Sequence, residues 1–182
     1  MRIIAGRWRG RKLAAPTGQD TRPTADRARQ ALYDMLMHSP WAAGAVVGAE
    51  VLDAFPGTGA MGLEALSRGA ARARFIESGR PALAVLRANI AACKAEGLAE
   101  VIAADATRPP RGTPSGLIFL DPPYGKGLVP RALAALDAAG WIAPGALILA
   151  EVSSDEAAPV AEDLLLADRR FGAARLCAWR AG

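Results

Sequence analysis

The spacing of apolar residues changes from a helical period to a strand period along the chain. Apolar residues recur at helical spacing between residues 25 and 38, which predicts an amphipathic helix there. From residue 49 onward, short apolar runs alternate with helical repeats, which indicates parallel strands joined by crossover helices. The predicted strands are 49–55, 73–77, 101–104, 115–120 and 146–152, with helices at 58–68, 81–95 and 129–139 and a closing antiparallel pair at 164–167 and 174–179.

The first 23 residues follow a different pattern. Residues 2–13 carry short apolar runs interleaved with arginines, which predicts a β-hairpin around a glycine turn. We therefore expect two regions, a basic hairpin arm over 1–23 and a main domain over 24–182. The expected fold is α/β: a Rossmann-like, seven-stranded, mostly parallel sheet with one antiparallel strand and helices on both faces, preceded by the N-terminal β-hairpin and helix.

Acidic residues stand where consecutive predicted strands end. Asp53 lies in the first strand, Glu77 ends the second, Asp105 follows the third and Asp121 follows the fourth. Because ligands of open α/β sheets bind at the carboxyl ends of the strands, these side chains predict one binding crevice.

A glycine loop follows the first strand, and it contains G-x-G-x-x-G from Gly57 to Gly62. This motif alone also suits a nicotinamide cofactor, whose pyrophosphate would lie at the helix N-terminus. Asp53 would repel a pyrophosphate, but it suits a cationic ligand such as S-adenosylmethionine. Glu77 is spaced to bind ribose hydroxyls, and Asp105 can accept a hydrogen bond from an adenine amino group.

The sequence Asp121-Pro122-Pro123-Tyr124 follows an apolar strand. A carboxylate and a proline carbonyl are pure acceptors, so together they can bind both hydrogens of an exocyclic amino group. Tyr124 can stack on the ring of an unpaired base. The motif therefore predicts a site for an aromatic amine.

Charge is concentrated at the N-terminus, although the whole chain carries only +4. Residues 1–30 hold eight Lys and Arg against two Asp, which is typical of a polyanion-binding surface. The two cysteines match no metal spacing and His38 is the sole histidine, so we expect no metal site. We also expect no membrane span and no secretory signal, hence a cytoplasmic protein, and a monomer because no long apolar face is left over.

In their order, these features resemble the RsmD family. The resemblance covers roughly residues 2–180 and rests on the basic arm, segment 22–27, the glycine loop 52–59, helix 62–69, Glu77, Asn89, Asp105 and the motif 121–124. It implies methyl transfer from S-adenosylmethionine to the exocyclic N2 amino group of a guanine in 16S ribosomal RNA, within a small ribosomal subunit or its assembly intermediate.

The resemblance also implies roles for individual residues. The catalytic set is Asp121, Pro122, Pro123 and Tyr124. The cofactor-binding set is Thr24, Asp53, Gly57, Thr58, Gly59, Glu77 and Asp105. The RNA-binding set is Arg2, Arg7, Trp8, Arg9, Arg11, Lys12 and Arg22, with Trp8 either stacking on a base or packing within the arm.

Three alternatives remain open from the residues alone. The same acceptor motif serves amino-methyltransferases that act on adenine or cytosine in DNA or RNA. The glycine loop also occurs in nicotinamide-dependent oxidoreductases, although Asp53 and the missing catalytic His or Tyr-Lys pair count against that class. A non-catalytic RNA-binding module would bind no S-adenosylmethionine.

Overall fold

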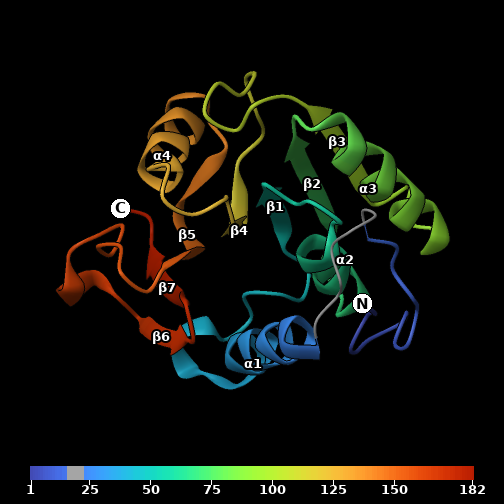
Figure 1. The fold of residues 1–182 in the computed structure, drawn as a ribbon, viewed down its shortest axis with the longest axis horizontal. Coiled ribbons are helices and arrows are strands. Elements are labelled where there is room, and N and C mark those ends of the chain that lie inside the picture. The colour runs from blue at the N-terminus through green and yellow to red at the C-terminus, as the bar shows by residue number, and fades with distance from the viewer. Residues whose placement is uncertain (16–22) are drawn as a thin grey trace.

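The computed structural model describes residues 1–15 and 23–182, with side chains described for 1–15 and 26–182. Its centre is a seven-stranded sheet in the order β3-β2-β1-β4-β5-β7-β6 (Figure 1). The strands are β1 Glu50–Ala54, β2 Arg72–Glu77, β3 Ala99–Ala103, β4 Ser115–Leu120, β5 Ile142–Ser153, β6 Ala167–Phe171 and β7 Ala174–Arg180. Strands β1 to β5 are parallel, and β7 runs antiparallel to both β5 and β6. The predicted mostly parallel sheet with one antiparallel strand is confirmed.

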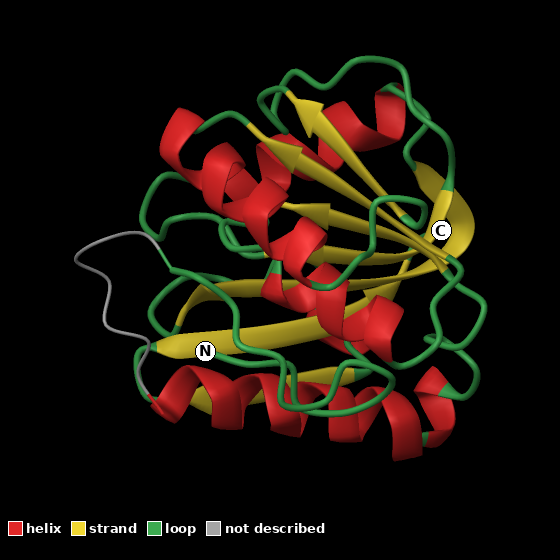
Figure 2. Cartoon of the chain, turned by 90° about the vertical axis from the view of Figure 1, so that its right-hand side faces the viewer, coloured by secondary structure: helices red, strands yellow, loops and turns green. Residues whose placement is uncertain are grey.

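Helices cover both faces of this sheet (Figure 2). They are α1 Pro23–His38, α2 Ala60–Ser67, α3 Arg80–Ala92 and α4 Leu128–Ala138, with short 3-10 turns at Pro40–Ala42 and Glu162–Leu164. Side chains of a strand alternate between faces, so Leu117 and Phe119 of β4 pack with α1, α2 and α3. Ile118 and Leu120 face the other way and pack with α4. Every central strand is therefore apolar on both sides, which is why the sequence shows continuous apolar runs.

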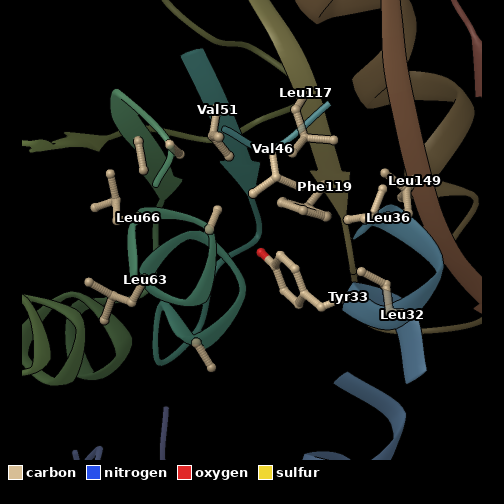
Figure 3. Packing of buried hydrophobic residues seen from close by; sticks show 14 of the residues in the cluster. Leu32, Tyr33, Leu36, Val46, Val51, Leu63, Leu66, Leu117, Phe119 and Leu149 are labelled. Carbon is tan, nitrogen blue, oxygen red and sulfur yellow. The ribbon is translucent and has the colours of Figure 1, made fainter. Parts of the chain in front are cut away.

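Tyr33 joins α1, α2 and β4 in the apolar core on the face of the sheet that α1, α2 and α3 cover (Figure 3). Its ring is fully buried and lies 6.0 Å from the ring of Phe119, between centroids. Its hydroxyl donates a hydrogen bond of 2.6 Å to the carbonyl of Met61 in α2. The contact satisfies the buried hydroxyl and fixes α1 against α2 and β4, beside the carboxyl ends of the strands.

The predicted N-terminal hairpin is wrong. Residues 2–13 form a loop closed by one antiparallel bridge between Arg2 and Lys12, and no pair of strands. The reason lies in α2: the backbone N–H groups of Ile4 and Ala5 donate to the carboxylate of Glu64, at 2.8 and 3.0 Å. The N–H of Arg7 donates to the carbonyl of Ser67, and the N–H of Trp8 donates to the Ser67 hydroxyl. Ile3 and Leu13 still donate across the loop to the carbonyls of Arg11 and Met1, but the N–H groups of residues 4, 5, 7 and 8 bind α2, so the pairing does not extend into two strands.

The penultimate strand also lies later than predicted. Strand β6 spans Ala167–Phe171, whereas the prediction placed a strand at 164–167 and a connection over 169–172. A two-residue turn at 172–173 makes the connection, with Gly172 at φ +64°. Arg175 of β7 sets the register by pairing with Asp168 of β6 through two hydrogen bonds, of 2.9 and 2.7 Å.

Among the described residues, no helix is long and apolar enough to cross a membrane.

Candidate active site

The loop between β1 and α2 depends on glycine at three points. Gly57 and Gly59 have φ of +54° and +79°, in the left-handed region that favours glycine. Gly62 lies inside α2, where an added Cβ would come 2.4 Å from the ring of Phe75. Phe55 is also left-handed, with φ +72°, which is a strained conformation for a residue with a side chain. The G-x-G-x-x-G pattern is thus explained by local geometry.

Asp53 lies beneath this loop and is only 2% exposed. Its Oδ2 accepts a 2.9 Å hydrogen bond from the N–H of Gly62, near the N-terminus of α2. Burial raises the pKa of Asp53 to about 7; the Gly62 hydrogen bond opposes this rise and the charge of Glu77 adds to it. A carboxylate buried at such cost favours a cationic ligand, because a positive charge nearby would restore the ionised form. This carboxylate therefore fits the positive charge of the ammonium and sulfonium groups of S-adenosylmethionine.

Glu77 and Asp105 lie at the ends of the next two strands. Glu77 accepts hydrogen bonds from the N–H groups of Gly57 and Gly79, at 3.2 and 2.7 Å, so it links the glycine loop to the end of β2. The Oδ1 of Asp105 accepts from the N–H and hydroxyl of Thr107, both at 2.8 Å, and these bonds lower its pKa. Asp105 is therefore an ionised turn-capping residue whose Oδ2 faces outward, 3.7 Å from Arg108.

The motif after β4 differs, because its acid is exposed. Asp121 and Tyr124 are exposed while Pro122 between them is buried. Although Asp121 contacts solvent, it lies at the edge of a protein-walled cavity that removes much of its water. That desolvation, followed by the charges of Glu151 and Asp53, raises its pKa to about 7. The hydroxyl of Tyr124 donates to the carboxylate of Glu151, and desolvation and this bond raise the pKa of Tyr124.

One cavity, of about 560 Å³, brings the acceptor motif next to the glycine loop. It is lined by the glycine loop, the end of β4, α1, β5 and the β6–β7 turn, including Thr58, Asp121, Tyr124 and Glu151. Asp53, Glu77 and Asp105 are not part of its wall. Asp53 is nevertheless close enough to raise the pKa of Asp121, and Glu77 is bonded to Gly57 beside the cavity. The structure thus brings together Thr58, Asp121 and Tyr124, and places Asp53 and Glu77 directly behind them.

Three further residues shape the site, although the sequence alone assigned no role to them. Glu151 lies in β5 and holds Tyr124, and its position near the end of a fifth strand is the same signal that marked the other acids. Asn89 of α3 is buried, accepts from the N–H of Ala14 at 2.7 Å, and donates to the carbonyls of Ala14 and Thr58. It fastens the N-terminal segment to the glycine loop.

The third is Glu64, which is fully buried in α2. Besides the two N–H groups of the arm, its carboxylate accepts a 2.8 Å hydrogen bond from Arg68 and lies 3.9 Å from Arg29. A charged residue within the apolar run of this helix was the available signal. Glu64 is thus the acid on which the arm, α1 and α2 converge.

The basic arm divides into docked and free residues. The guanidinium of Arg7 donates to the carbonyl of Leu66 at the end of α2, at 2.8 and 3.2 Å, and stacks over Trp8 at 4.9 Å. Trp8 packs against the core, which fits its packing role. The other exposed basic side chains of residues 1–15 are those of Arg2, Arg9, Arg11 and Lys12. Arg22 lies outside the described residues, and so does the side chain of Thr24.

The exposed basic residues border two hollows. One, of about 380 Å³, is lined by Arg2, Arg9 and Arg27, and the other, of about 590 Å³, by Arg7 to Lys12 and Ala92. Within the described part of the chain, no group of three or more His, Cys, Asp or Glu could bind a metal ion.

The sequence is similar to known proteins over almost its whole length. Residues 1–180 match the family described as Conserved hypothetical protein 95. Ribosomal RNA small subunit methyltransferase D of Escherichia coli strain K12 is 42% identical over 161 residues, which is 87% of this chain and 78% of that protein. The protein of the same name from Haemophilus influenzae is 37% identical, over 86% and 80%. A solved structure of the Escherichia coli protein yhhF is 38% identical, with a TM-score of 0.83, and the match covers 99% of this chain and 97% of that one.

Proposed function

This chain belongs to the Conserved hypothetical protein 95 family, the family of RsmD, and from this membership and the site geometry we propose that it methylates small-subunit ribosomal RNA. The methyl group passes from S-adenosylmethionine to the exocyclic N2 amino group of a guanine in 16S RNA. The observation that carries the proposal is the single cavity in which Asp121 and Tyr124 adjoin the glycine loop.

Asp53, Glu77, Asp105 and the loop 57–59 would hold S-adenosylmethionine. When bound, it supplies an electrophilic methyl group on a sulfonium. Asp53 neutralises positive charge from beneath the loop, and Glu77 binds hydroxyls while keeping Gly57 in place. We assign Thr24 to the same group of cofactor contacts, from the resemblance alone.

The acceptor side prepares a poor nucleophile. The lone pair of an exocyclic guanine nitrogen is delocalised into the ring. By accepting its two hydrogens, Asp121 and the Pro122 carbonyl localise that lone pair, and the stiffness of Pro122 and Pro123 preserves the arrangement. Tyr124, held by Glu151, stacks on the base, so that much of the rate gain comes from orientation. With its pKa raised to about 7, Asp121 is also a stronger base than an ordinary carboxylate for the departing proton.

The decisive experiment is transfer of labelled methyl to small ribosomal subunits from cells lacking the endogenous activity, followed by digestion to nucleosides. N2-methylguanosine is expected as the labelled product. A labelled methyladenosine or methylcytidine would support the alternative base specificity, and the absence of any transfer would refute the function. Naked 16S RNA, run in parallel, separates an assembled particle from free RNA as the substrate.

The arm over residues 1–23 is proposed to bind RNA phosphates, mainly through Arg2, Arg9, Arg11 and Lys12. Truncation is a poor test, because residues 3–5 contribute to the core and bind Glu64. Replacing the exposed Arg9 and Arg11 with alanine should instead weaken RNA binding and lower the salt-dependence slope by about 0.7 per contact. The control Arg72→Ala removes an exposed charge at the start of β2, far from the arm in sequence, and should leave the slope unchanged. An unaltered slope in the double variant would rule out the arm.

We further propose that the protein acts as a cytoplasmic monomer. Among the residues whose side chains are described, the large exposed apolar ones are Met37, Val47, Tyr124, Leu164, Leu166 and Phe171, which are spread over several elements. Sedimentation at assay concentration tests this expectation.

A further inference from the structure

The β6–β7 turn lies at the mouth of the active-site cavity, on the other side from the basic arm. Phe171, Gly172 and Ala173 line the cavity together with Asp121 and Tyr124. Phe171 remains 40% exposed, although a phenylalanine at a turn could have been buried against α1. In Figure 1 the two strands lie at the end of the sheet, beside α1. An aromatic ring therefore stands free next to the proposed acceptor site.

Strand register separates the two arginines that precede this ring. Arg169 pairs with Leu176, and Phe171 pairs with Ala174. Both Leu176 and Ala174 line the cavity, so Arg169 lies on the same side of β6 as Phe171. Arg170 pairs with Arg175 and lies on the opposite side. Phe171 thus lines the cavity, Arg169 lies on the same face of β6 two residues before it, and Arg170 lies on the opposite face.

The turn is firmly anchored at its base. Arg175 donates two hydrogen bonds to Asp168, at 2.9 and 2.7 Å, and a third to the carbonyl of Glu156, at 3.2 Å. This fixes the hairpin to the chain that follows β5 and keeps Phe171 at the mouth of the cavity. A rigid aromatic side chain loses little entropy when it binds a base, which favours recognition.

We propose that Phe171 and Arg169 form a second RNA contact, which binds the nucleotide next to the target guanine. The inference rests on the proposed function and extends it. Phe171 stacks on an unpaired neighbouring base and Arg169 contacts its phosphate, while Tyr124 holds the guanine itself. An aromatic face beside a positive charge is the usual platform for single-stranded nucleic acid. The predicted RNA contacts in the N-terminal arm would then fix the substrate from one side, and the β6–β7 turn from the other.

The test compares steady-state methylation by Phe171→Ala, Arg169→Ala and the matched control Arg170→Ala, using small ribosomal subunits as substrate. Loss of one stacked base should raise the KM for RNA in Phe171→Ala by about 10-fold or more, since stacking contributes about 1–3 kcal/mol. Arg169→Ala should raise it by a few-fold and reduce the salt slope by about 0.7, whereas Arg170→Ala should leave both unchanged. Affinity for S-adenosylmethionine should stay the same in all three.

Two conservative variants separate stacking from packing. Phe171→Tyr keeps the ring and should retain the wild-type KM, whereas Phe171→Leu keeps apolar volume and should behave like Phe171→Ala. The inference is overturned if Phe171→Ala retains the wild-type KM for RNA, or if the two arginine variants lose affinity equally. Failure of the proposed function itself would look different, because the unchanged chain would then transfer no methyl group to guanine.

Discussion

The loops that follow β1 and β4 occupy equivalent places on neighbouring strands, yet they are built in opposite ways. The strands are paired in register up to Ala54 and Leu120. Behind the β1 loop, the carboxylates of Asp53 and Glu77 already accept hydrogen bonds from backbone N–H groups. After β4, the carboxylate of Asp121 is exposed and accepts no hydrogen bond from the described residues. The first set of acids holds the protein together, and the second is free for a substrate.

Because of this difference, substitutions behind the β1 loop and substitutions at Asp121 should affect different quantities, namely stability and turnover. A change on the β1 side disturbs buried bonds that shape the loop, so it should alter the free energy of unfolding. A change at Asp121 removes a group that the fold itself does not use, so it should alter the reaction alone.

The largest effect is expected at Asp121. Asp121→Ala should lower kcat for methyl transfer by about 10²- to 10⁴-fold, because it removes both an acceptor and a base. The protein should unfold no more easily, because the Asp121 carboxylate accepts no hydrogen bond from the described residues and, when ionised, lies beside the charges of Glu151 and Asp53. S-adenosylmethionine should bind within a few-fold of the wild-type affinity. The matched control is Asp137→Ala, an exposed acid in α4. A near wild-type rate in Asp121→Ala would remove the assigned role.

The next effect is expected at Glu64, on the other side of the division. Glu64→Ala leaves the guanidinium of Arg68 without its carboxylate, removes one of the two acids beside the buried Arg29, and frees two N–H groups of the arm. Breaking a buried ion pair in this way costs about 3–5 kcal/mol. Urea unfolding should show this loss, whereas Glu96→Ala, at an exposed position, should show almost none. Equal stability of the two variants would mean that the arm does not depend on the buried acid.

Most of the sheet could be predicted from the sequence because the signals are local. Continuous apolar runs marked the strands, and acids at their ends marked the crevice. Glycines showed where the chain turns, as the steric limits at Gly62 explain. The antiparallel last strand also followed from alternation and turn residues.

What could not be predicted depends on partners distant in sequence. The arm has the composition of a hairpin, but its N–H groups bind Glu64 and Ser67, about 60 residues away. The same applies to Asn89, whose amide binds Ala14 across 75 positions. The predicted position of β6 is wrong because the apolar run at 164–166 is more typical of a strand than the charged segment Ala167–Phe171. That segment forms the strand because Asp168 within it binds Arg175 of β7. Glu151 was overlooked, although it repeats the strand-end pattern of the other acids.

Asp53 should make the stability of the protein depend on pH. With its pKa raised from an ordinary value of about 3.9 to about 7, the folded protein holds a proton that the unfolded chain loses. Stability due to this group is therefore complete below pH about 4, falls as pH rises to about 7, and then stays level. Asp53→Asn keeps an acceptor for the Gly62 N–H and removes the charge. Its gain in unfolding free energy should be about 1–3 kcal/mol larger at pH 8 than at pH 5.

Urea titrations of Asp53→Asn at the two pH values measure this gain, with Asp137→Asn as the exposed control. The variant should also bind S-adenosylmethionine more weakly, because the cation loses its counter-charge. A gain that does not vary with pH would show that Asp53 is ionised throughout, and a variant that binds the cofactor normally would remove Asp53 from the site.

The smallest effect is expected at Glu151, where the two sides of the site meet. The charges that face Asp121 are Glu151 on β5 and Asp53 on β1, and both raise its pKa. Glu151→Gln keeps an acceptor for the Tyr124 hydroxyl and removes one of these charges. The pKa of Asp121 should therefore fall, and the acid limb of kcat/KM should move to lower pH by less than about one unit.

Glu156→Gln is the matched control for this shift. Glu156 accepts hydrogen bonds from Gly125 and Ser153 near the same loop, but its charge does not act on Asp121. The acid limb of the kcat/KM profile should therefore lie at the same pH in Glu156→Gln as in the wild type. If Glu151→Gln shifts no further than Glu156→Gln, desolvation by the cavity wall alone sets the pKa of Asp121. The protonation of Asp121 would then depend on its cavity alone, and the charges of Glu151 and Asp53 on the neighbouring strands would not affect its pKa.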